Sequence, residues 1–348
     1  MTEKYLNLRS DTVTLPTKEM YDAIMECQLG DDNRQEDPTV NKLEKMAANM
    51  FEKESAILLT SGTMGNLVGV MVNTRPGDEI IMEQDAHIWH DEQGAFAAIG
   101  SVVAHLVKGV LGYPRPEDIE NAIRPLNNVH KPKTALVCLE NTHNHAGGTV
   151  LTAEQIDEVA EVAHRHNIPV HLDGARIFNA SVKLGISVSR LTRNVDTVTF
   201  CLSKGLCCPV GAIFLGKKET IERARRIRKL LGGTMRQAGI IAAPGIVALN
   251  AMIDRLQDDH ETAAILAREL YAIPPLNINR ETVQTNMVYV DISQTGIKSE
   301  DFVSRLKQYN IEMLVAGPYY LRLVTHRHVC KEDVPRIVAA IKNVVTSI

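Results

Sequence analysis

Asp173 and its neighbours form the first group of residues that could carry out chemistry. The apolar run Pro169–Leu172 delivers Asp173 to the carboxyl end of a strand. Gly174 then permits a sharp exit, and Arg176 follows closely. A carboxylate in that position can hold a cationic ring nitrogen. A helix-capping aspartate with a nearby salt bridge is the alternative, and this motif alone favours neither.

Lys204 follows 31 residues later, directly after the mostly apolar run Val198–Ser203. A lysine that closes a buried strand must shed water from its amine, which favours the neutral, nucleophilic form. Such lysines form imines with carbonyl substrates or with pyridoxal phosphate. The alternative is a lysine whose tip reaches solvent. Alone, Lys204 favours that alternative; together with Asp173 it favours an imine-forming site.

The segment Ser61–Asn66 is a strand-to-helix turn rich in small residues, where an anion could bind. Free backbone N–H groups and the helix dipole favour negative charge at such a turn, and Thr63 adds a hydroxyl next to Gly62. The segment matches neither the P-loop nor the dinucleotide-binding fingerprint. An ordinary helix N-terminus is the simpler interpretation of this segment taken alone.

Four histidines gather in two short segments, EQDAHIWHDEQG and ENTHNHAGG. They are His87, His90, His143 and His145. Two histidines two residues apart could indicate zinc, but no HExxH motif or other compact ligand set accompanies them, so we predict no catalytic metal. A ring-stacking partner or a general base is the better functional interpretation.

Basic residues in the second half of the chain are candidate partners for anions. Arg322 emerges from the strand-like segment Tyr320–Val324 and is well shaped to grip a carboxylate through two hydrogen bonds. Arg236 follows the glycine pair Gly232–Gly233, and Lys229 precedes that pair. These two could neutralise a phosphate. A structural ion pair for Arg322, and solvated side chains for the other two, are the alternatives.

The elements that must position these residues alternate between short β-rich runs and helical patterns. The strand-like runs are Ser55–Thr60, Glu79–Met82, Ser101–Val107, Thr134–Glu140, Pro169–Asp173, Asp196–Leu202 and Gly211–Leu215. They are apolar on both faces, as expected when helices cover both sides of a sheet. Helices are predicted at Gly62–Thr74 and at Thr152–Asn167, where Thr152 can cap the first turn. The alternation predicts an α/β doubly wound, mostly parallel sheet, with ligands at the carboxyl ends of its strands.

The pattern changes after Arg236. A long helical stretch, Arg236–Ala272, is expected to be broken by Pro244. Two strands and two helices predicted beyond it form a smaller α+β unit; they are Met287–Ile292, Tyr320–Val324, Ser299–Gln308 and Glu332–Val345. We therefore predict three parts: an N-terminal arm at residues 1–16, a large α/β domain at 17–245 and a small α+β domain at 246–348.

Composition limits the functional classes. Apolar residues make up 45% and charged residues 23% of the 348-residue chain, which is typical of a soluble globular protein. The formal net charge of −4 gives no reason to expect nucleic acid or an anionic membrane as a partner. No apolar run approaches the length of a membrane span, and the N-terminal residues do not resemble a signal peptide. Six scattered cysteines are predicted to be free thiols, so a cytoplasmic location is expected.

Eight segments, in order along the chain, resemble the low-specificity L-threonine aldolase family of fold-type I pyridoxal-5′-phosphate (PLP) enzymes. They are LRSDTVTLPT at Leu8–Thr17, EDPTVNKLE at Glu36–Glu44, SGTMGN at Ser61–Asn66, ENTHN at Glu140–Asn144, HLDGARIFNA at His171–Ala180, FCLSKGL at Phe200–Leu206, MRQAG at Met235–Gly239 and RLVTH at Arg322–His326. The resemblance covers nearly the whole chain. It implies PLP as the cofactor, and a PLP-dependent transferase-like fold with a mostly parallel seven-stranded sheet and a smaller α+β C-terminal domain.

The resemblance also implies roles toward the cofactor. Lys204 holds PLP as an imine, Asp173 pairs with the ring nitrogen, and Arg176 lies near the phenolic oxygen. His87 stacks on the ring. The residues implied to hold the phosphate are Gly62, Thr63 and Arg236. Lys229 is implied to reach the site from another subunit, so we expect a homo-oligomer, dimer or tetramer, with shared active sites.

For the substrate, a small amino acid, the resemblance implies that Ser10 and Arg322 bind the carboxylate and that His143 lies near the hydroxyl group. The implied reaction of this aldehyde-lyase is retro-aldol cleavage of an L-β-hydroxy-α-amino acid, of the threonine or allo-threonine type, to glycine and an aldehyde. His143, His87 or an ordered water are the candidate bases that remove the hydroxyl proton. The cofactor carries the organic chemistry, and the protein selects the bond that breaks.

The sequence departs from the family pattern in places that border the family's substrate pocket or subunit contacts. Arg34 and Gln35 replace a usual tyrosine and glycine, Asp91 replaces an aromatic residue, and His145 and Ala146 replace the arginine and serine of ENTHNRSGG. Charged side chains at these positions make the pocket more polar. We therefore expect altered side-chain specificity, toward a charged donor or acceptor.

Two alternatives to the aldolase stay open. One is another PLP reaction on a related amino acid, such as transaldol exchange, β-elimination or racemisation. The other is a non-catalytic PLP-binding protein. The second is disfavoured because Lys204, Asp173 and Arg322 occur together, and storage of the cofactor needs no clamp for a substrate carboxylate.

Overall fold

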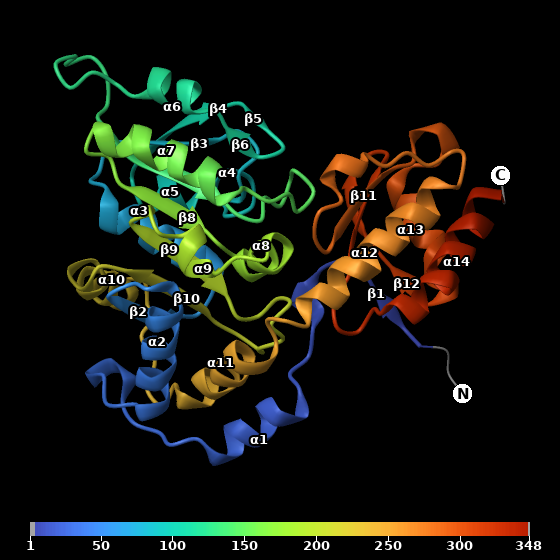
Figure 1. Cartoon of the computed structure of the whole chain (residues 1–348), viewed down its shortest axis with the longest axis horizontal. Helices are drawn as coiled ribbons and strands as arrows, with labels where there is room; N and C mark the ends of the chain where they lie inside the picture. The colour runs from blue at the N-terminus through green and yellow to red at the C-terminus, as the bar shows by residue number, and fades with distance from the viewer. Residues whose placement is uncertain (1–3, 347–348) are drawn as a thin grey trace.

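The computed structural model describes residues 4–346, and its largest element is a seven-stranded sheet (Figure 1). The strand order is β2 (Ser55–Leu59), β10 (Ala212–Gly216), β9 (Thr197–Cys201), β8 (Val170–Asp173), β7 (Thr134–Glu140), β3 (Glu79–Glu83) and β4 (Val103–Val107). Strand β10 pairs antiparallel with both its neighbours, and the pairs from β9 to β4 are all parallel. The prediction of a mostly parallel seven-stranded α/β sheet is confirmed.

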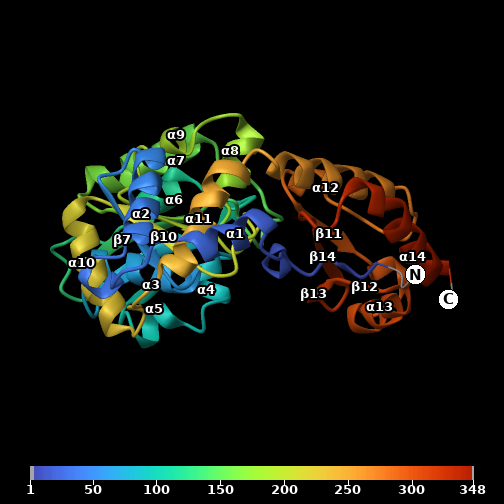
Figure 2. The same ribbon diagram turned by 90° about the horizontal axis from the view of Figure 1, so that it is seen from below.

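Both faces of the sheet are buried, because the side chains of its strands alternate between two cores. In β2, Ala56 and Leu58 belong to one core, and Ile57 and Leu59 belong to another. Helices cover both faces, as Figure 2 shows. The first core holds residues of α1 (Lys18–Glu26), α2 (Pro38–Phe51), α6 (Pro116–Ala122), α7 (Ala153–Arg165), α8 (Ile177–Leu184) and α9 (Val188–Leu191). The opposite face carries α3 (Gly62–Asn73), α4 (His87–His90), α5 (Ala95–Ala98) and α10 (Lys218–Leu230).

Helix α7 illustrates how local sequence sets an element. Thr152 is its N-cap: the Thr152 hydroxyl accepts the N–H of Gln155 at 3.3 Å, and the Gln155 side chain accepts the N–H of Thr152 at 2.9 Å. One face of the helix, including Ile156 and Val159, is buried against the sheet. The cap that the sequence predicts is therefore present.

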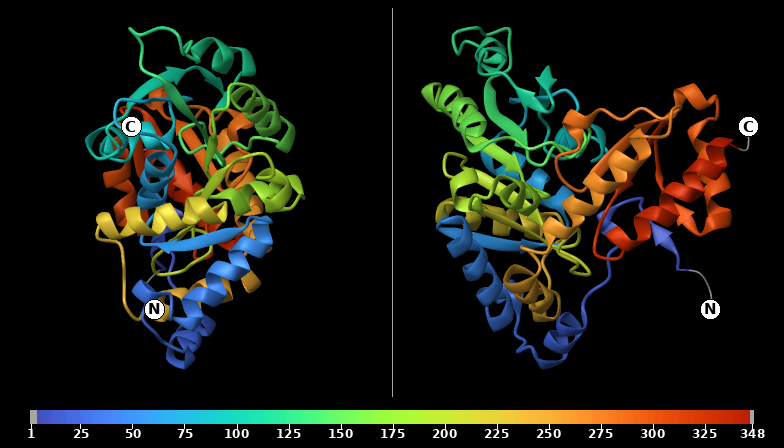
Figure 3. Two further views of the ribbon diagram at one scale, coloured as in Figure 1. Left: turned by 90° about the vertical axis from the view of Figure 1, so that its left-hand side faces the viewer. Right: turned by 45° about the vertical axis from the view of Figure 1, so that its right-hand side comes forward.

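A second core lies in the C-terminal third, well separated from the large sheet in Figures 1 and 3. Its antiparallel sheet has the order β11 (Met287–Asp291), β14 (Tyr320–Val324) and β13 (Leu314–Gly317). Its helices are α12 (Leu256–Tyr271), α13 (Ser299–Leu306) and α14 (Val334–Thr346). The N-terminal strand β1 (Leu6–Asn7) joins this unit by pairing in parallel with β12 (Ile311–Glu312). This is the smaller C-terminal α+β unit that the sequence predicts.

The expected helix break at Pro244 is wrong. Pro244 lies inside α11 (Gly239–Ala251), and the chain turns instead at residues 252–255, before α12. The proline costs the helix one hydrogen bond, to Ile240 in its first turn, and α11 stays continuous because it packs against α1 and α2. We therefore propose the turn at residues 252–255 as the boundary between the two units. Residues 1–3 of the predicted arm and 347–348 of the predicted small domain lie outside the described residues.

A helix that spans a membrane must be both long and apolar. Within residues 4–346, no single helix is both long and apolar enough for a span; the bent pair α11 and α12 meets the criterion only when joined.

Candidate active site

The carboxyl ends of β7, β8 and β9 bring most of the predicted site residues to one edge of the sheet. The register pairs Glu140 with Asp173, and Asp173 with Thr199. Lys204 follows the end of β9 by three residues. Strand β2 runs in the same direction, so Gly62 at the start of α3 reaches the same edge. Ligands of such sheets bind at this edge.

Asp173 is buried, and protein groups hold both of its carboxylate oxygens. Its Oδ1 accepts the N–H of Ala175 at 3.0 Å, and its Oδ2 accepts a hydrogen bond from Asn66 Nδ2 at 2.7 Å. The N-cap of the following helix is Arg176 rather than Asp173. The helix-capping alternative for this aspartate is therefore not what the structure shows.

The loop after β9 fixes the backbone of Lys204 and leaves its amine available. The Lys204 carbonyl accepts hydrogen bonds from the Thr14 hydroxyl at 2.8 Å and from the N–H of Cys207 at 2.9 Å. The side chain is half-buried, and within residues 4–346 its Nζ has no hydrogen-bond or ion-pair partner. This amine can therefore form a bond to a ligand without first breaking a contact.

His87 stands at the start of α4, with its ring anchored through one nitrogen. Its Nδ1 lies 2.9 Å from Glu92 Oε1, its backbone N–H donates to Glu140 Oε2 at 2.7 Å, and its Nε2 lies 3.9 Å from Asp91 Oδ2. Burial alone would lower the pKa of His87, but the Glu92 hydrogen bond and the charge of Asp173 raise it overall. Nε2 is therefore the nitrogen left to face a ligand.

Asn66 links the carboxylates of Glu92 and Asp173 through hydrogen bonds. Its Nδ2 donates to Glu92 Oε1 and to Asp173 Oδ2, both at 2.7 Å. Burial raises the pKa of Glu92, and the charge of Asp173 adds to this effect. Ligand atoms of His87, Glu92 and Asp173 lie within 4.8 Å of one another, a spacing that could also hold a cation. These groups already share hydrogen bonds with one another, and the absence of a catalytic metal stays a prediction.

His143 is buried, and both its ring nitrogens contact protein. Nε2 lies 3.1 Å from Glu83 Oε2, and Nδ1 accepts the N–H of Ala146 at 3.2 Å. Burial alone would lower the pKa of His143, but the charges of Glu140 and Glu83 raise it overall. This environment suits a residue that shapes the loop more than a free general base.

Arg322 reaches the same edge from β14 of the small unit. Its Nη1 donates to Asn144 Oδ1 and its Nη2 to the carbonyl of Arg9, both at 3.1 Å. Its Nε–H is buried and has no acceptor within residues 4–346. Ser10 is the next residue after Arg9 in this loop. The structure thus brings Arg322 and Ser10 close, and the unpaired Nε–H suits an anionic ligand.

The start of α3 has the shape expected of an anion cradle. The Ser61 hydroxyl caps the helix by accepting the N–H of Met64 at 3.2 Å, and Thr63 is exposed. A Cβ atom at Gly62 would lie 2.7 Å from Cys201 Sγ. Glycine therefore lets this turn approach the end of β9, next to the Lys204 loop.

Arg236 and Lys229 are not drawn into the site within this chain. The loop that carries Arg236 does lie against α3, since a Cβ atom at Gly233 would meet Met64 at 2.6 Å. Arg236 itself is exposed and pairs with Asp31 at 3.0 Å. Lys229 is exposed on α10. Their implied contacts with phosphate and with a neighbouring site remain predictions.

Arg176 is buried beside this edge, paired with a residue that the sequence analysis did not select. Its Nε and Nη2 donate to the two carboxylate oxygens of Asp11 at 2.7 and 2.6 Å. Asp11 belongs to the N-terminal segment, next to Ser10. The N-terminal segment therefore contributes Ser10, which is predicted to bind the substrate, and Asp11, which pairs with the predicted cofactor ligand Arg176.

The positions that depart from the family pattern fall into two groups. Arg34 is exposed and lies 3.8 Å from Asp31. Asp91 and His145 pair at 2.7 Å, and Asp91 also borders His87. His145 lines a cavity of about 200 Å³ together with Tyr289. The second group is thus connected to His87 through Asp91.

Sequence reasoning missed five polar residues that hold the site together. They are Asp11, Asn66, Glu92, Glu140 and Asn144. All except Glu92 lie inside the eight family-like segments, so the resemblance could have indicated these four residues as site residues. Glu92 carried no signal, because its role depends on contacts with Asn66 and His87 that only the fold creates.

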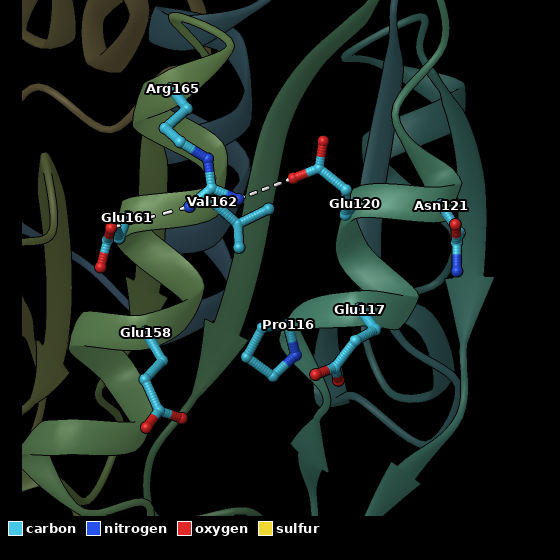
Figure 4. A pocket seen from close by; sticks show the side chains of 8 residues that line it. All are labelled: Pro116, Glu117, Glu120, Asn121, Glu158, Glu161, Val162 and Arg165. Atoms are coloured by element: carbon cyan, nitrogen blue, oxygen red, sulfur yellow. Dashed lines mark hydrogen bonds and ion pairs between the residues drawn. The ribbon is translucent and has the colours of Figure 1, made fainter.

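Two of the larger cavities lie elsewhere. One, of about 490 Å³, lies between α6 and α7 and is lined by four glutamates and Arg165, as Figure 4 shows. The other, of about 870 Å³, borders the starts of β7 and β8 at the opposite edge of the sheet. Neither contains a predicted site residue.

The residues at the strand ends fit PLP. The free amine of Lys204 and the buried carboxylate of Asp173 suit the aldehyde and the ring nitrogen of this cofactor. The glycine-lined start of α3 suits its phosphate. The unpaired Nε–H of Arg322 suits a substrate carboxylate.

Comparison with known proteins gives the same picture. The family described as Beta-eliminating lyase matches residues 7–293. The probable low-specificity L-threonine aldolase 2 of Arabidopsis thaliana is 40% identical over 347 residues, covering 99% of this chain and 98% of that protein. A more distant relative, the alanine racemase TOXG of Cochliobolus carbonum, is 32% identical over 316 residues, covering 88% of this chain and 80% of that protein.

Among solved structures, the threonine aldolase of Leishmania major superposes with a TM-score of 0.83. That match is 20% identical and covers 98% of this chain and 99% of the other, so it supports the fold. The family match and the 40% identity show the family as well as the fold. The chain belongs to the beta-eliminating lyase family, among the relatives of the low-specificity L-threonine aldolases.

Proposed function

We propose that this protein is a PLP-dependent aldehyde-lyase that cleaves an L-β-hydroxy-α-amino acid, of the threonine or allo-threonine type, to glycine and an aldehyde. One arrangement carries the proposal: the amine of Lys204 and the buried Asp173 share an edge with Arg322, whose buried Nε–H lacks an acceptor among residues 4–346. The names of the close relatives support the same reaction.

PLP supplies a ring that accepts the electron pair released when a bond at the substrate α-carbon breaks. Residues of the chain bind and orient the cofactor and the substrate. Asp173 keeps the ring nitrogen protonated, and the N–H groups at Gly62 and Thr63 bind the phosphate. Arg322 and Ser10 bind the substrate carboxylate and so set which bond lies across the ring.

The two candidate bases have different surroundings. His143 uses both ring nitrogens within the protein, whereas the Nε2 of His87 is 3.9 Å from its nearest acidic partner, Asp91. We therefore propose that His87, or a water molecule that it holds, removes the proton of the substrate hydroxyl group. His143 instead fixes the conformation of its loop.

A panel of amino acids tests the reaction. Purified PLP-loaded enzyme is incubated with L-threonine, L-allo-threonine and β-hydroxy amino acids with charged side chains, and both aldehyde and glycine are measured. Equal amounts of the two products are expected. The Lys204→Ala variant should lose the visible cofactor absorbance and the turnover. A variant that kept both, or a wild type that bound PLP and released no aldehyde from any substrate, would contradict the proposal.

Racemisation is the second candidate, because a relative 32% identical to this chain carries the name alanine racemase. It needs removal of the α-proton rather than cleavage of a carbon–carbon bond. The same preparation is therefore given L-alanine, and D-alanine is measured with a D-amino-acid oxidase. Racemisation without aldehyde release in the panel would favour this candidate over the aldolase.

The pair Asp91 and His145 supports a preference for polar substrates. Their side chains are 41% and 37% exposed and lie next to His87 at the site wall. An aromatic residue at position 91 would favour apolar substituents instead. We propose that substrates with a polar or charged β-substituent have a higher kcat/KM than threonine in the panel, and a clear preference for threonine would reject this part.

We further propose a homo-oligomer, dimer or tetramer, in which Lys229 completes a neighbouring site. Its exposure on α10 supports a role outside its own chain. The proposed location is cytoplasmic, which agrees with the six cysteines being free thiols.

A further inference from the structure

A buried ion pair joins the N-terminal segment to the loop after β8. Arg176 donates two hydrogen bonds to the Asp11 carboxylate, at 2.7 and 2.6 Å, and the two side chains are 5% and 0% exposed. Asn286 Nδ2 donates a third hydrogen bond to Asp11 Oδ2 at 3.2 Å. A guanidinium held at two points by a buried carboxylate cannot reorient on its own.

Several titratable groups surround this pair. Burial alone would raise the pKa of Asp11, but the attraction of Arg176 and then of Lys204 holds it well below its usual range, so the carboxylate stays charged. The other titratable groups around the pair are Cys201, Asp173, Glu140, Asp259 and His326. Burial raises the pKa of the Cys201 thiol. Among these groups, Asp11 is the carboxylate that contacts Arg176 directly.

We propose that Asp11 is a positioning residue for the bound cofactor: it fixes the Arg176 guanidinium and supplies the negative charge that offsets Arg176 and the Lys204 nitrogen. The inference rests on the proposed function, since it takes PLP to be attached at Lys204. Without Asp11, Arg176 loses the carboxylate that pairs with it, and a second positive charge on the Lys204 nitrogen becomes less favourable.

The test uses the colour of the PLP-loaded enzyme. The visible absorbance of PLP attached to a lysine changes when the linking nitrogen gains or loses a proton, so it can be titrated with pH without any substrate. In Asp11→Asn, the midpoint is expected to move to lower pH by about one unit or more, a tenfold loss of proton affinity. Asp11→Glu keeps the charge and is expected to hold the midpoint near that of the wild type.

Glu44→Gln is the matched control. Glu44 is also buried and paired with an arginine, Arg225, at 2.6 Å, but it lies on α2 and supports β2. Its midpoint should equal the wild-type value. An unchanged midpoint in Asp11→Asn with PLP bound would overturn the proposal, because a purely structural role predicts loss of protein or cofactor without a shift.

A second variant covers the case in which Asp11→Asn does not fold. Arg176→Gln removes the cation, so its midpoint is expected to move to higher pH. No shift, or a shift to lower pH, would count against the proposal. A wild type that shows no visible absorbance with PLP would instead refute the proposed cofactor attachment, so the two failures are distinguishable.

Discussion

At the scale of single residues, what the sequence predicted depended on how far apart the partners lie along the chain. Lys204 and Asp173 could be found because an apolar run precedes each of them: Asp173 is the last residue of β8, and Lys204 follows the end of β9 by three residues. Asp11, the partner of Arg176, is 165 positions away along the chain, so no local sequence pattern indicates the pair. His143 was predicted as a candidate base, and its burial against Glu83, 60 positions away, could not be foreseen.

The pair of Glu83 and His143 leads to a prediction about pH and stability. Burial alone would raise the pKa of Glu83, but the hydrogen bond from His143 lowers it below 4.5; the pKa of His143 is raised above 6.5. Stabilisation from Glu83 is present above pH 4.5 and is lost as pH falls through its lowered pKa. Stabilisation from His143 is present below pH 6.5 and is lost as pH rises through its raised pKa.

Glu83→Gln is therefore expected to lower the free energy of unfolding most between about pH 4.5 and 6.5, by about 1–3 kcal/mol. Urea unfolding of the variant and the wild type on both sides of this window and inside it measures the difference. Glu120→Gln, at an exposed glutamate that also contacts a histidine, serves as control. A difference that stayed constant with pH would show that the ion pair is not the cause.

At the scale of elements, the sequence predicted the apolar strands well and the shortest helices not at all. Strand β7 has the predicted bounds, because a run of buried residues marks it from end to end. The four-residue helices α4 and α5 went unpredicted, since so few residues show no periodicity. The break expected at Pro244 failed because packing against α1 and α2 outweighs one lost hydrogen bond.

Helix α3 gives the prediction at this scale. A Cβ atom at Gly65 would lie 2.0 Å from Thr199 Oγ1, so Gly65→Ala must push the start of α3 away from β9. Because that start is the proposed phosphate cradle, we expect the affinity for PLP to fall at least about tenfold, or about 1.4 kcal/mol. Titration of the cofactor-free protein with PLP measures this.

Met71→Ala is the comparison variant, at a half-buried position on the last turn of the same helix. It should bind PLP like the wild type, because it leaves the first turn in place. Equal affinity in Gly65→Ala would mean that the contact with β9 does not set the cradle.

At the scale of the whole molecule, the division into a large α/β unit and a smaller α+β unit was visible in the sequence as a change of pattern after Arg236. The sequence did not show which residues of the two units meet at the candidate site. Arg322 comes from the small unit and contacts Asn144 of the large one, 178 positions away.

Mixing two inactive variants tests the shared site. If Lys229 serves a neighbouring subunit, Lys204→Ala and Lys229→Ala are each nearly inactive, but a mixed dimer has one site with both lysines. Random mixing makes about half of the dimers mixed, each with one competent site of two, so activity should recover to about a quarter of the wild-type value. A Lys229→Ala variant that is fully active alone, or a mixture no better than its parts, would reject the shared site.

The parallel pairing of β1 with β12 has a consequence for the order in which the protein is completed during synthesis. A chain leaves the ribosome N-terminus first, and its early parts begin to fold before the rest exists. Leu6 pairs with Ile311 and Asn7 with Glu312, so strand β1 has no partner until Ile311 and Glu312 have been translated. Ser10 and Asp11 lie a few residues after that strand. The segment that carries Ser10 and Asp11 therefore cannot be anchored through β1 until β12 has been made.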